Sequence, residues 1–455
     1  MKNFTNFSLK LFLFLSFLVF LYAIYRAEIH YLGHDRSIVY AKYFKYIIVS
    51  IFFSLFFFLS IRLESQKKVY IVISVYSLLI SLYIAELTLL YKFNYLPQKK
   101  NHIFFEEKNR NLEIKYIKKI INLVKKETYP FIGFDSGFFK DNQEIYPLGN
   151  LSDTNIHLCH ETGQDVFYKS DRYGFRNTDN VWEKDEVDYL LIGDSFVHGF
   201  CVQESDTLSG LIKTKTNQNI INLGIGGYGP LSEYATFLEF AVEKKPKKVL
   251  WFFFEGNDLT KNLRYEKEIN ILMNYLNKNE IQNLKNYRDF LNNSMKKKII
   301  ENLSLKEIEI KKPINKNEKQ PTVLIIENLL QNTKFLRLWA LRTLIRNSFS
   351  RDGVDPLFEK ILEKTNKIVK KWNGELYFIY LPEKKRYSNK FNFYVSGENF
   401  RNKKDVQKIV KNLNIKFIDT DKKVFSKFEN PLELFDIHYN EKGYSLIVDE
   451  ILKVN

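Results

Sequence analysis

Three long apolar segments near the N-terminus constrain this chain more than any other feature. They cover residues 11–25, 46–61 and 69–91, and Glu86 is the only charged residue inside them. A helix that spans a membrane needs about 20 mostly apolar residues. The first two segments are shorter, but flanking Lys or Arg side chains can reach the headgroup region and lengthen the span. We therefore expect three transmembrane helices that contact a lipid bilayer.

The first segment can also be interpreted as a cleaved signal peptide, because Lys2 and Lys10 precede it as the basic n-region of such a peptide would. The sequences at the end of this segment, Leu21-Tyr-Ala23 and Tyr25-Arg-Ala27, lack the pair of small residues at which signal peptides are cleaved. We favour a retained membrane helix.

Positive charge in the short loops bears on the membrane orientation. Arg62, Lys67 and Lys68 lie in the loop 62–68, which favours a cytoplasmic position for that loop. Everything after residue 92 would then lie outside the cytoplasm. The loop 26–45 also carries four Lys or Arg residues, so charge alone leaves the orientation open.

After residue 92 the chain becomes rich in Lys and Asn. Apolar residues at helical spacing predict an amphipathic basic helix over 111–126, through Ile117, Ile120, Ile121 and Val124. Such a helix can lie on anionic lipid, or it can pack on the domain as a surface helix. We divide the chain into an anchor (1–92), a linker helix and lead-in (93–187) and a main domain (188–455).

Five short apolar runs separated by helical patterns indicate an α/β fold for the main domain. Helical stretches such as 231–243 and 402–412 lie between them. Apolar strands that alternate with helices are typical of a parallel sheet covered on both faces. Ligands of such sheets bind beyond the carboxyl ends of the strands, and three of these strands end in clusters of Gly and polar residues. The expected strands are 189–192, 220–223, 249–254, 376–380 and 415–418.

The segment 259–370 interrupts this alternation with a charged, helical pattern. Within it, Phe335, Leu336 and Trp339 belong to a basic amphipathic stretch. We interpret the segment as an insertion, either a lid or a surface that faces the membrane.

Several of the polar residues have the chemistry that acyl transfer needs. Ser195 follows the strand 189–192 in the sequence Gly-Asp-Ser, where its hydroxyl would lie at the rim of the sheet beside main-chain N–H groups. Asn257 can donate an amide N–H to an oxyanion, and Gly227 lets the main chain approach a ligand closely. Taken singly, each is equally explained as a helix cap or a turn residue.

Asp436 and His438 lie close together near the C-terminus of a chain with only seven histidines. A carboxylate that accepts the N–H of a histidine can orient that histidine as the general base of a serine. Glu433, Glu441 and Asp419 are alternative partners for His438. A lone Asp-x-His is otherwise a common sequence.

A glycine pattern in the chain matches a dinucleotide-binding loop only in part. The sequence Gly224-x-Gly226-x-x-Gly229 follows one strand and precedes a helix, as such a loop should. The acidic residue expected about 20 positions later is missing, since Glu255 lies 31 positions after Gly224. We therefore expect no nucleotide cofactor.

Metal and nucleic-acid binding are also disfavoured. His157, Cys159 and His160 match no standard metal-site spacing. The formal net charge is +16, which suits anionic lipid or an acidic glycan because no nucleic-acid-binding motif accompanies it. Cys159 and Cys201, the two cysteines, flank Ser195. Outside the cytoplasm they can form a disulfide that braces the turn after Ser195.

Together these elements form a pattern more specific than any one of them. Four blocks follow one another, each just beyond an expected strand or near the C-terminus: Gly193-Asp-Ser195, Asn222-x-x-x-x-Gly227, Gly256-Asn257-Asp258 and Asp436-x-His438. In this respect the chain resembles the SGNH (GDSL-type) hydrolase superfamily, whose four blocks carry Ser, Gly, Asn and His. The resemblance covers about 188–455 and is interrupted by the insertion.

The resemblance implies a flavodoxin-like three-layer α/β/α fold with a parallel sheet, here preceded by the transmembrane helices. It also implies that Ser195 is the nucleophile, His438 the general base and Asp436 its orienting acid, with no metal or organic cofactor. The N–H groups of Ser195 and Gly227 and the side chain of Asn257 would form an oxyanion hole.

Two details refine the resemblance. The esterase branch usually has Asp-x-x-His, whereas Asp436 precedes His438 by two residues, as in the polysaccharide O-acetyltransferase and acetylesterase-like branches. The lead-in 170–177 is similar to that of many membrane-anchored bacterial members. We expect an ester hydrolase of the bacterial inner membrane, with its catalytic domain in the periplasm or outside the cell, that cleaves O-acyl groups of a surface glycan through an acyl-serine. The alternatives are an O-acyltransferase and a non-catalytic glycan-binding scaffold.

Overall fold

The computed structural model of the chain forms two compact units. The first contains residues 1–97 and 324–342, and the second contains 98–323 and 343–455. Of the segments named above, several parts lie outside the described residues: 32–35 of the first loop, 93–101, 134–135 and 161–162 of the linker and lead-in, and 312–334 and 350–352 of the insertion. Those described are 2–31, 36–92, 102–133, 136–160, 163–311, 335–349, 353–388, 400 and 402–454.

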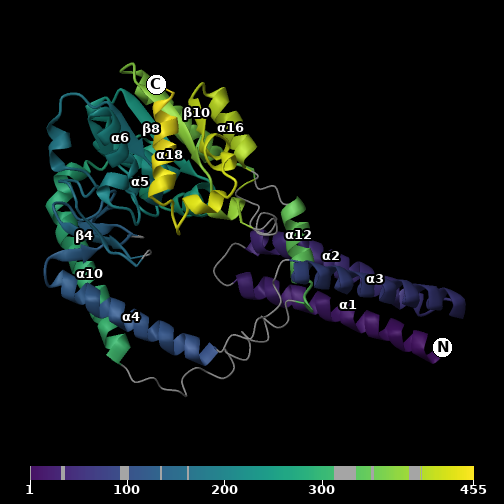
Figure 1. Cartoon of the computed structure of the whole chain (residues 1–455). Helices are drawn as coiled ribbons and strands as arrows, with labels where there is room; N and C mark the ends of the chain where they lie inside the picture. The colour runs from purple at the N-terminus through teal and green to yellow at the C-terminus, as the bar shows by residue number, and fades with distance from the viewer. Residues whose placement is uncertain are drawn as a thin grey trace. The chain divides into compact units, whose positions relative to one another are not determined.

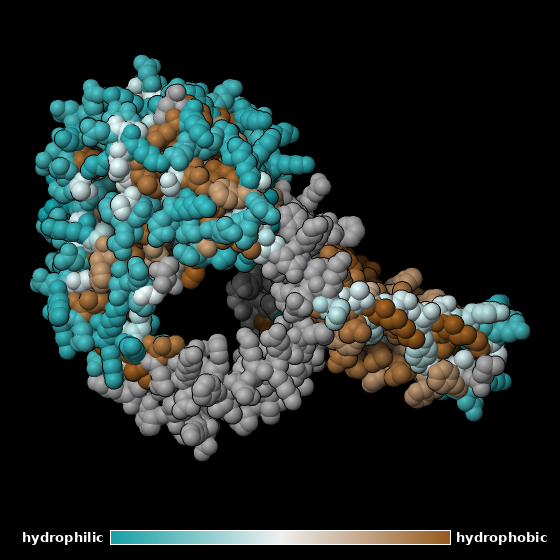
Figure 2. All heavy atoms as spheres, viewed as in Figure 1, coloured by the Kyte–Doolittle hydropathy of each residue, from teal (hydrophilic) through white to brown (hydrophobic). Residues whose placement is uncertain are grey.

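Three long helices make up most of the first unit (Figure 1), namely α1 (Lys2–Tyr31), α2 (Arg36–Ser60) and α3 (Ser65–Lys92). Many of their large apolar side chains are exposed, and Figure 2 shows them as a largely brown surface. An apolar surface of this size needs a lipid environment or a partner. The expected helices are confirmed as apolar segments whose length and composition allow a membrane crossing: Lys2–Ile29, Tyr43–Ser60 and Ser65–Tyr91.

A buried carboxylate joins α3 to the start of α12 (Trp339–Phe349). Glu86 is fully buried, and its two oxygens accept the N–H groups of Ala340 and Leu341, each at 2.8 Å. A carboxylate at a helix N-terminus satisfies N–H groups that the helix itself leaves unpaired. Residues 335–342 of the insertion therefore pack with the apolar helices, which favours the membrane-facing interpretation of this part over a lid.

The second unit is built on a five-stranded sheet in which all neighbouring strands are parallel. Its strands are β6 (Tyr189–Ile192), β7 (Ile220–Asn222), β8 (Lys248–Phe254), β9 (Glu375–Leu381) and β10 (Lys416–Asp419). Their spatial order is β10-β9-β8-β6-β7. Read from the other edge and numbered along the chain, this is the flavodoxin-like order 2-1-3-4-5. Each expected strand is present, with its ends within about one residue of the predicted ones.

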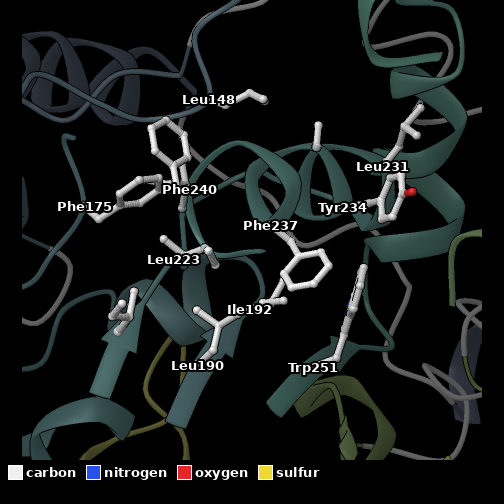
Figure 3. Close-up of a cluster of buried hydrophobic side chains, with 14 of the residues drawn as sticks. Leu148, Phe175, Leu190, Ile192, Leu223, Leu231, Tyr234, Phe237, Phe240 and Trp251 are labelled. Atoms are coloured by element: carbon white, nitrogen blue, oxygen red, sulfur yellow. The ribbon is translucent and has the colours of Figure 1, made fainter. Parts of the chain in front are cut away.

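Helices cover both faces of this sheet (Figure 1). Leu191 points to one face of the sheet, and Ile192 and Trp251 point to the opposite face. Each face is covered by its own set of helices (Figure 1). Figure 3 shows Phe237 and Tyr234 over Ile192 and Trp251. Since side chains of a strand point alternately to opposite faces, strands between two helix layers are apolar throughout. The predicted three-layer α/β/α fold is confirmed, with α6 (Leu208–Thr216) and α18 (Glu441–Leu452) on one face and α7 (Pro230–Phe240), α13 (Pro356–Lys370) and α16 (Lys403–Asn412) on the other.

The lead-in, the insertion and two connections of the main domain supply the remaining elements among the described residues. A three-stranded sheet of order β1-β4-β5 shares the core of the large sheet, and β2 and β3 form a separate antiparallel pair. These strands are β1 (Thr128–Pro130), β2 (Phe138–Lys140), β3 (Gln143–Ile145), β4 (Asn155–Cys159) and β5 (Val166–Lys169). The other helices are α4 (His102–Val124), α5 (Ser195–His198), α8 (Leu263–Glu266), α9 (Asn270–Asn277), α10 (Arg288–Lys311) and α17 (Thr420–Lys423).

Helix α4 contains most of the predicted amphipathic segment. Ile117 and Ile120 are buried, and Lys119 forms an ion pair with Asp165 of the lead-in. Because the apolar face is covered by protein, the structure supports a helix that packs on the domain over one that lies on lipid.

Candidate active site

Ser195 begins the short helix α5, directly beyond the carboxyl end of β6. The Asp194 carboxylate accepts the N–H of Phe196 at 3.0 Å and thereby caps this helix. Phe196 is buried against the sheet, whereas Ser195 is half-buried. Asp194 and Phe196, on either side of Ser195, are therefore held in place, and the Ser195 side chain lies at the rim of the sheet, as predicted.

His438 approaches Ser195 from the far end of the chain. Its Nε2 lies 2.9 Å from the Ser195 Oγ. The rings of Phe196 and Phe200 flank the imidazole, with centroids 4.8 and 5.3 Å from it. A base at this distance can remove the hydroxyl proton. The structure thus brings together two predicted residues that are 243 positions apart.

Asp436 is fixed beside His438 through its main chain. Its N–H donates to the His438 carbonyl at 2.8 Å, and its own carbonyl accepts from the Lys384 ammonium at 2.8 Å. The residue is exposed. The alternative acid Asp419 caps α17 and pairs with Lys403 at 2.7 Å.

Gly227 lies in an exposed turn beyond β7. The Tyr228 N–H closes this turn on the Ile225 carbonyl at 3.2 Å, and Gly227 has a φ of +89°. A positive φ at the third residue of a turn favours glycine. Among the described residues, neither the Gly227 nor the Ser195 N–H has a hydrogen-bond partner. Both groups are therefore available to a bound oxyanion.

Asn257 follows β8 and is half-buried. Its side chain lies beside the Asp194 carboxylate: burial raises the pKa of that carboxyl, and the Asn257 side chain is one of the groups that partly offset the rise. Its Oδ1 is buried and has no partner within the described part of the chain. Asn257 is therefore next to the turn that carries Ser195, as the order of the strand ends predicts.

Two residues that the sequence analysis did not identify hold the Gly227 turn from its C-terminal side. The Asn262 amide donates to the Tyr228 carbonyl at 2.6 Å. The buried Glu266 carboxylate accepts the N–H groups of Gly229 and Leu231 at 2.7 and 3.0 Å. A sequence signal does exist, because Asp258, Asn262 and Glu266 recur every four residues and so lie on one helical face.

The lead-in holds the same loops from another side. The buried Arg176 guanidinium donates to the carbonyls of Gly199 and Val202 at 2.8 and 3.1 Å. Asn177 exchanges two hydrogen bonds with the main chain of Asn222, both at 2.9 Å. The segment 170–177, singled out by resemblance, therefore supports the turns beyond β6 and β7.

The predicted disulfide between Cys159 and Cys201 is confirmed. It ties the end of β4 to the turn after α5, with Cα atoms 5.7 Å apart. His157 and His160, which we disfavoured as metal ligands, lie 2.8 and 3.0 Å from the Asp165 carboxylate. Within the described ranges, no three His, Cys, Asp or Glu side chains are placed to hold a metal ion.

Three buried carboxyl groups lie near the Ser195 turn. Burial is the main cause that raises the pKa of Asp194 to about 6 and the pKa values of Glu233 and Asp258 well above their usual range. Repulsion between these groups raises the pKa values of Glu233 and Asp258 further. In both groups the direction of the shift favours the neutral, protonated form.

The raised pKa values of these carboxyl groups predict how the stability of the folded chain depends on pH. An acid whose pKa is raised by folding keeps its proton where the unfolded chain has lost it, so the native state loses stability as pH rises above about 4. Glu233→Gln removes one such group. We expect an unchanged unfolding midpoint at pH 4.5 and a midpoint about 2–4 °C higher at pH 8, which corresponds to about 1 kcal/mol.

The matched control is Glu243→Gln, an exposed residue paired with Lys285. The pKa of Glu243 is lowered, chiefly by its hydrogen bond to Lys285, so this variant should gain nothing at pH 8. Thermal unfolding of the three proteins at both pH values is the measurement. Parallel pH profiles for wild type and Glu233→Gln would contradict the prediction.

No protein-family model matches this sequence, and no curated protein matches it. Among solved structures, the chain is similar to a member of the lipolytic G-D-S-L family from Veillonella parvula at 13% identity, with 59% of this chain and 97% of that one covered and a TM-score of 0.30. A lipase/acylhydrolase from Enterococcus faecalis gives 13% identity, coverage of 59% and 94%, and a TM-score of 0.30. An acetyl xylan esterase gives 14% identity, coverage of 59% and 99%, and a TM-score of 0.30.

Proposed function

We propose that this chain is a membrane-anchored ester hydrolase of the SGNH type that acts through an acyl-serine. The observation that carries the proposal is the 2.9 Å contact between Ser195 Oγ and His438 Nε2. Two further features support it, namely the N–H groups of Ser195 and Gly227, which have no hydrogen-bond partner in the described part of the chain, and the nearby Asn257 amide. A glycan-binding scaffold would need none of this arrangement.

In the proposed reaction, Ser195 Oγ attacks the ester carbonyl while His438 Nε2 takes its proton. The oxyanion that forms accepts hydrogen bonds from the N–H groups of Ser195 and Gly227 and from the Asn257 amide. His438 then gives the proton to the leaving alcohol, and the acyl group stays on Ser195. Water then attacks this acyl-serine while His438 takes one of its protons; as the bond from the acyl carbon to Ser195 Oγ breaks, His438 returns that proton to Oγ, which releases the carboxylic acid and restores free Ser195.

We propose O-acyl groups of a surface glycan as the substrate. The formal charge of +16 suits an acidic polymer or an anionic membrane surface, and the apolar helices of the first unit suit attachment to a bilayer. If a sugar hydroxyl instead of water attacks the acyl-serine, the same residues give acyl transfer.

The test uses the full chain in detergent with a fluorophosphonate probe, followed by a panel of acetylated glycans with and without an acceptor sugar. Labelling that disappears in Ser195→Ala and release of acetate from at least one glycan are the expected results. Acetate found on the acceptor would assign transfer. Equal labelling of wild type and Ser195→Ala would overturn the proposal.

We propose that Asp436 orients His438, because it is the nearest acid in sequence and its main chain is bonded to that of His438. Asp436→Asn should then leave the protein folded and lower its rate on an activated acetyl ester by orders of magnitude. Asp419→Asn is the control, since that carboxylate pairs with Lys403. Near wild-type activity in Asp436→Asn with an inactive Asp419→Asn would move the role to Asp419.

We propose that the second unit lies outside the cytoplasm. A fluorescent protein that folds only in the cytoplasm, fused to the C-terminus, should stay dark. Cys159 and Cys201 should resist alkylation until reduced, because an oxidising compartment preserves their disulfide. A bright fusion, or two freely alkylated thiols in cells, would contradict this orientation.

A further inference from the structure

His198 is a fully buried histidine that the proposed reaction does not use. It ends the helix α5 that begins with Ser195. Its ring lies within a group of aromatic side chains, with centroids 4.9, 5.4 and 5.5 Å from those of Phe131, Tyr168 and Phe200. A histidine in such a group is most simply a packing residue, but its two ring nitrogens have specific partners.

The hydrogen bonds of His198 assign its protons. The Gly226 N–H donates to Nδ1 at 3.2 Å, so Nδ1 carries no proton. Nε2 therefore carries the proton and donates to the Tyr168 hydroxyl at 3.0 Å. Burial lowers the pKa of His198 well below its usual range, and the Arg176 charge lowers it further. The neutral ring is thus a fixed acceptor aimed at the main chain of Gly226.

Gly226 directly precedes the glycine whose N–H we place in the oxyanion hole. Gly226 and Gly227 are consecutive glycines, and glycine has more conformational freedom in φ and ψ than any other residue. Asn262 and Glu266 hold the turn only from Tyr228 onward. On the other side of Gly227, the hydrogen bond to His198 holds Gly226.

We propose that His198 is a positioning residue of the oxyanion hole, which fixes Gly226 so that the Gly227 N–H points at the reacting carbonyl. The inference rests on the proposed function. His198 does not touch the substrate, and Tyr168 acts through it by holding the tautomer in which Nδ1 is the acceptor. The helix that presents the nucleophile therefore also sets the direction of one oxyanion donor.

Two substitutions separate this role from packing. His198→Phe keeps an aromatic ring among Phe131, Tyr168 and Phe200 but offers no acceptor to Gly226. His198→Asn leaves a gap in the aromatic group, but its Oδ1 can take the place of Nδ1. Positioning predicts that the Phe variant loses kcat by about 10²-fold with KM within about threefold, because a lost oxyanion donor costs about that much. It also predicts that the Asn variant keeps a higher kcat despite a lower unfolding midpoint.

A packing role predicts the opposite order, with kcat near wild type in His198→Phe and the larger loss in His198→Asn, and this result would overturn the inference. If His198→Phe does not fold, Tyr168→Phe replaces it, since that variant leaves His198 and every ring in place. It should lower kcat several-fold and also lower the unfolding midpoint, because the buried Nε2–H of His198 loses its acceptor. An unchanged kcat would overturn the inference. Turnover that persists in Ser195→Ala would instead reject the proposed function itself.

Discussion

Replacing Ser195 or His438 by alanine is expected to lower kcat on an activated acetyl ester by about 10⁴- to 10⁶-fold, because in the proposed reaction the nucleophile and the base act as one unit. The 2.9 Å contact between them makes each depend on the other. For the same reason the double variant should be hardly slower than the slower single variant. Initial rates of the three variants and the wild type provide the test.

Ser205→Ala and His160→Ala are the matched controls. Ser205 is an exposed serine ten residues after Ser195, and His160 pairs with Asp165 on the lead-in. Both controls should keep wild-type rates. A His438→Ala enzyme that retains a few per cent of the activity would show that another group removes the Ser195 proton.

Asn257→Ala should give the second largest loss, about 10²- to 10³-fold in kcat with little change in KM or stability. One N–H donated to the oxyanion strengthens in the transition state, so its removal affects kcat more than substrate binding. The side chain lies beside Asp194, at the turn that carries Ser195. Steady-state kinetics and an unfolding curve for each protein are the measurements.

Asn270→Ala, an exposed residue at the start of α9, is the control and should behave as wild type. An Asn257→Ala enzyme with unchanged kcat would make Asn257 a turn residue only. A rise in KM alone would place it in ground-state binding instead.

The fold of the second unit could be predicted from the sequence because burial on two faces leaves a clear pattern. Residues such as Leu191 and Ile192 face opposite helix layers, so the strand is apolar at every position. The carboxyl ends of parallel strands meet at one edge, which is why Ser195 and Asn257 could be expected to lie close together. The position of His438 beside Ser195 followed only from the resemblance, because His438 does not come directly after a strand of the large sheet.

The supporting contacts could not be predicted in the same way. Glu86 reaches Ala340 across 254 positions, and His198 reaches Gly226 through a single ring nitrogen. Hydrophobic periodicity reports whether a side chain is buried and carries no information about which polar group it meets. Buried polar groups nearly always find a partner, but the identity of that partner depends on the finished fold.

The supports supplied by the lead-in determine how the enzyme can be cut. Arg176, Asn177 and Cys159 all precede residue 188, yet each is bonded to the turn after α5 or to the end of β7, next to the candidate active site. A soluble fragment that starts at the first strand of the large sheet would lose all three and expose apolar surface that the lead-in covers. A secreted or recombinant form therefore has to begin no later than β1, at Thr128. After a proteolytic cut between β5 and β6, the disulfide still ties the lead-in to the domain that follows it. Once that disulfide is reduced, we expect the domain released without the lead-in to be inactive.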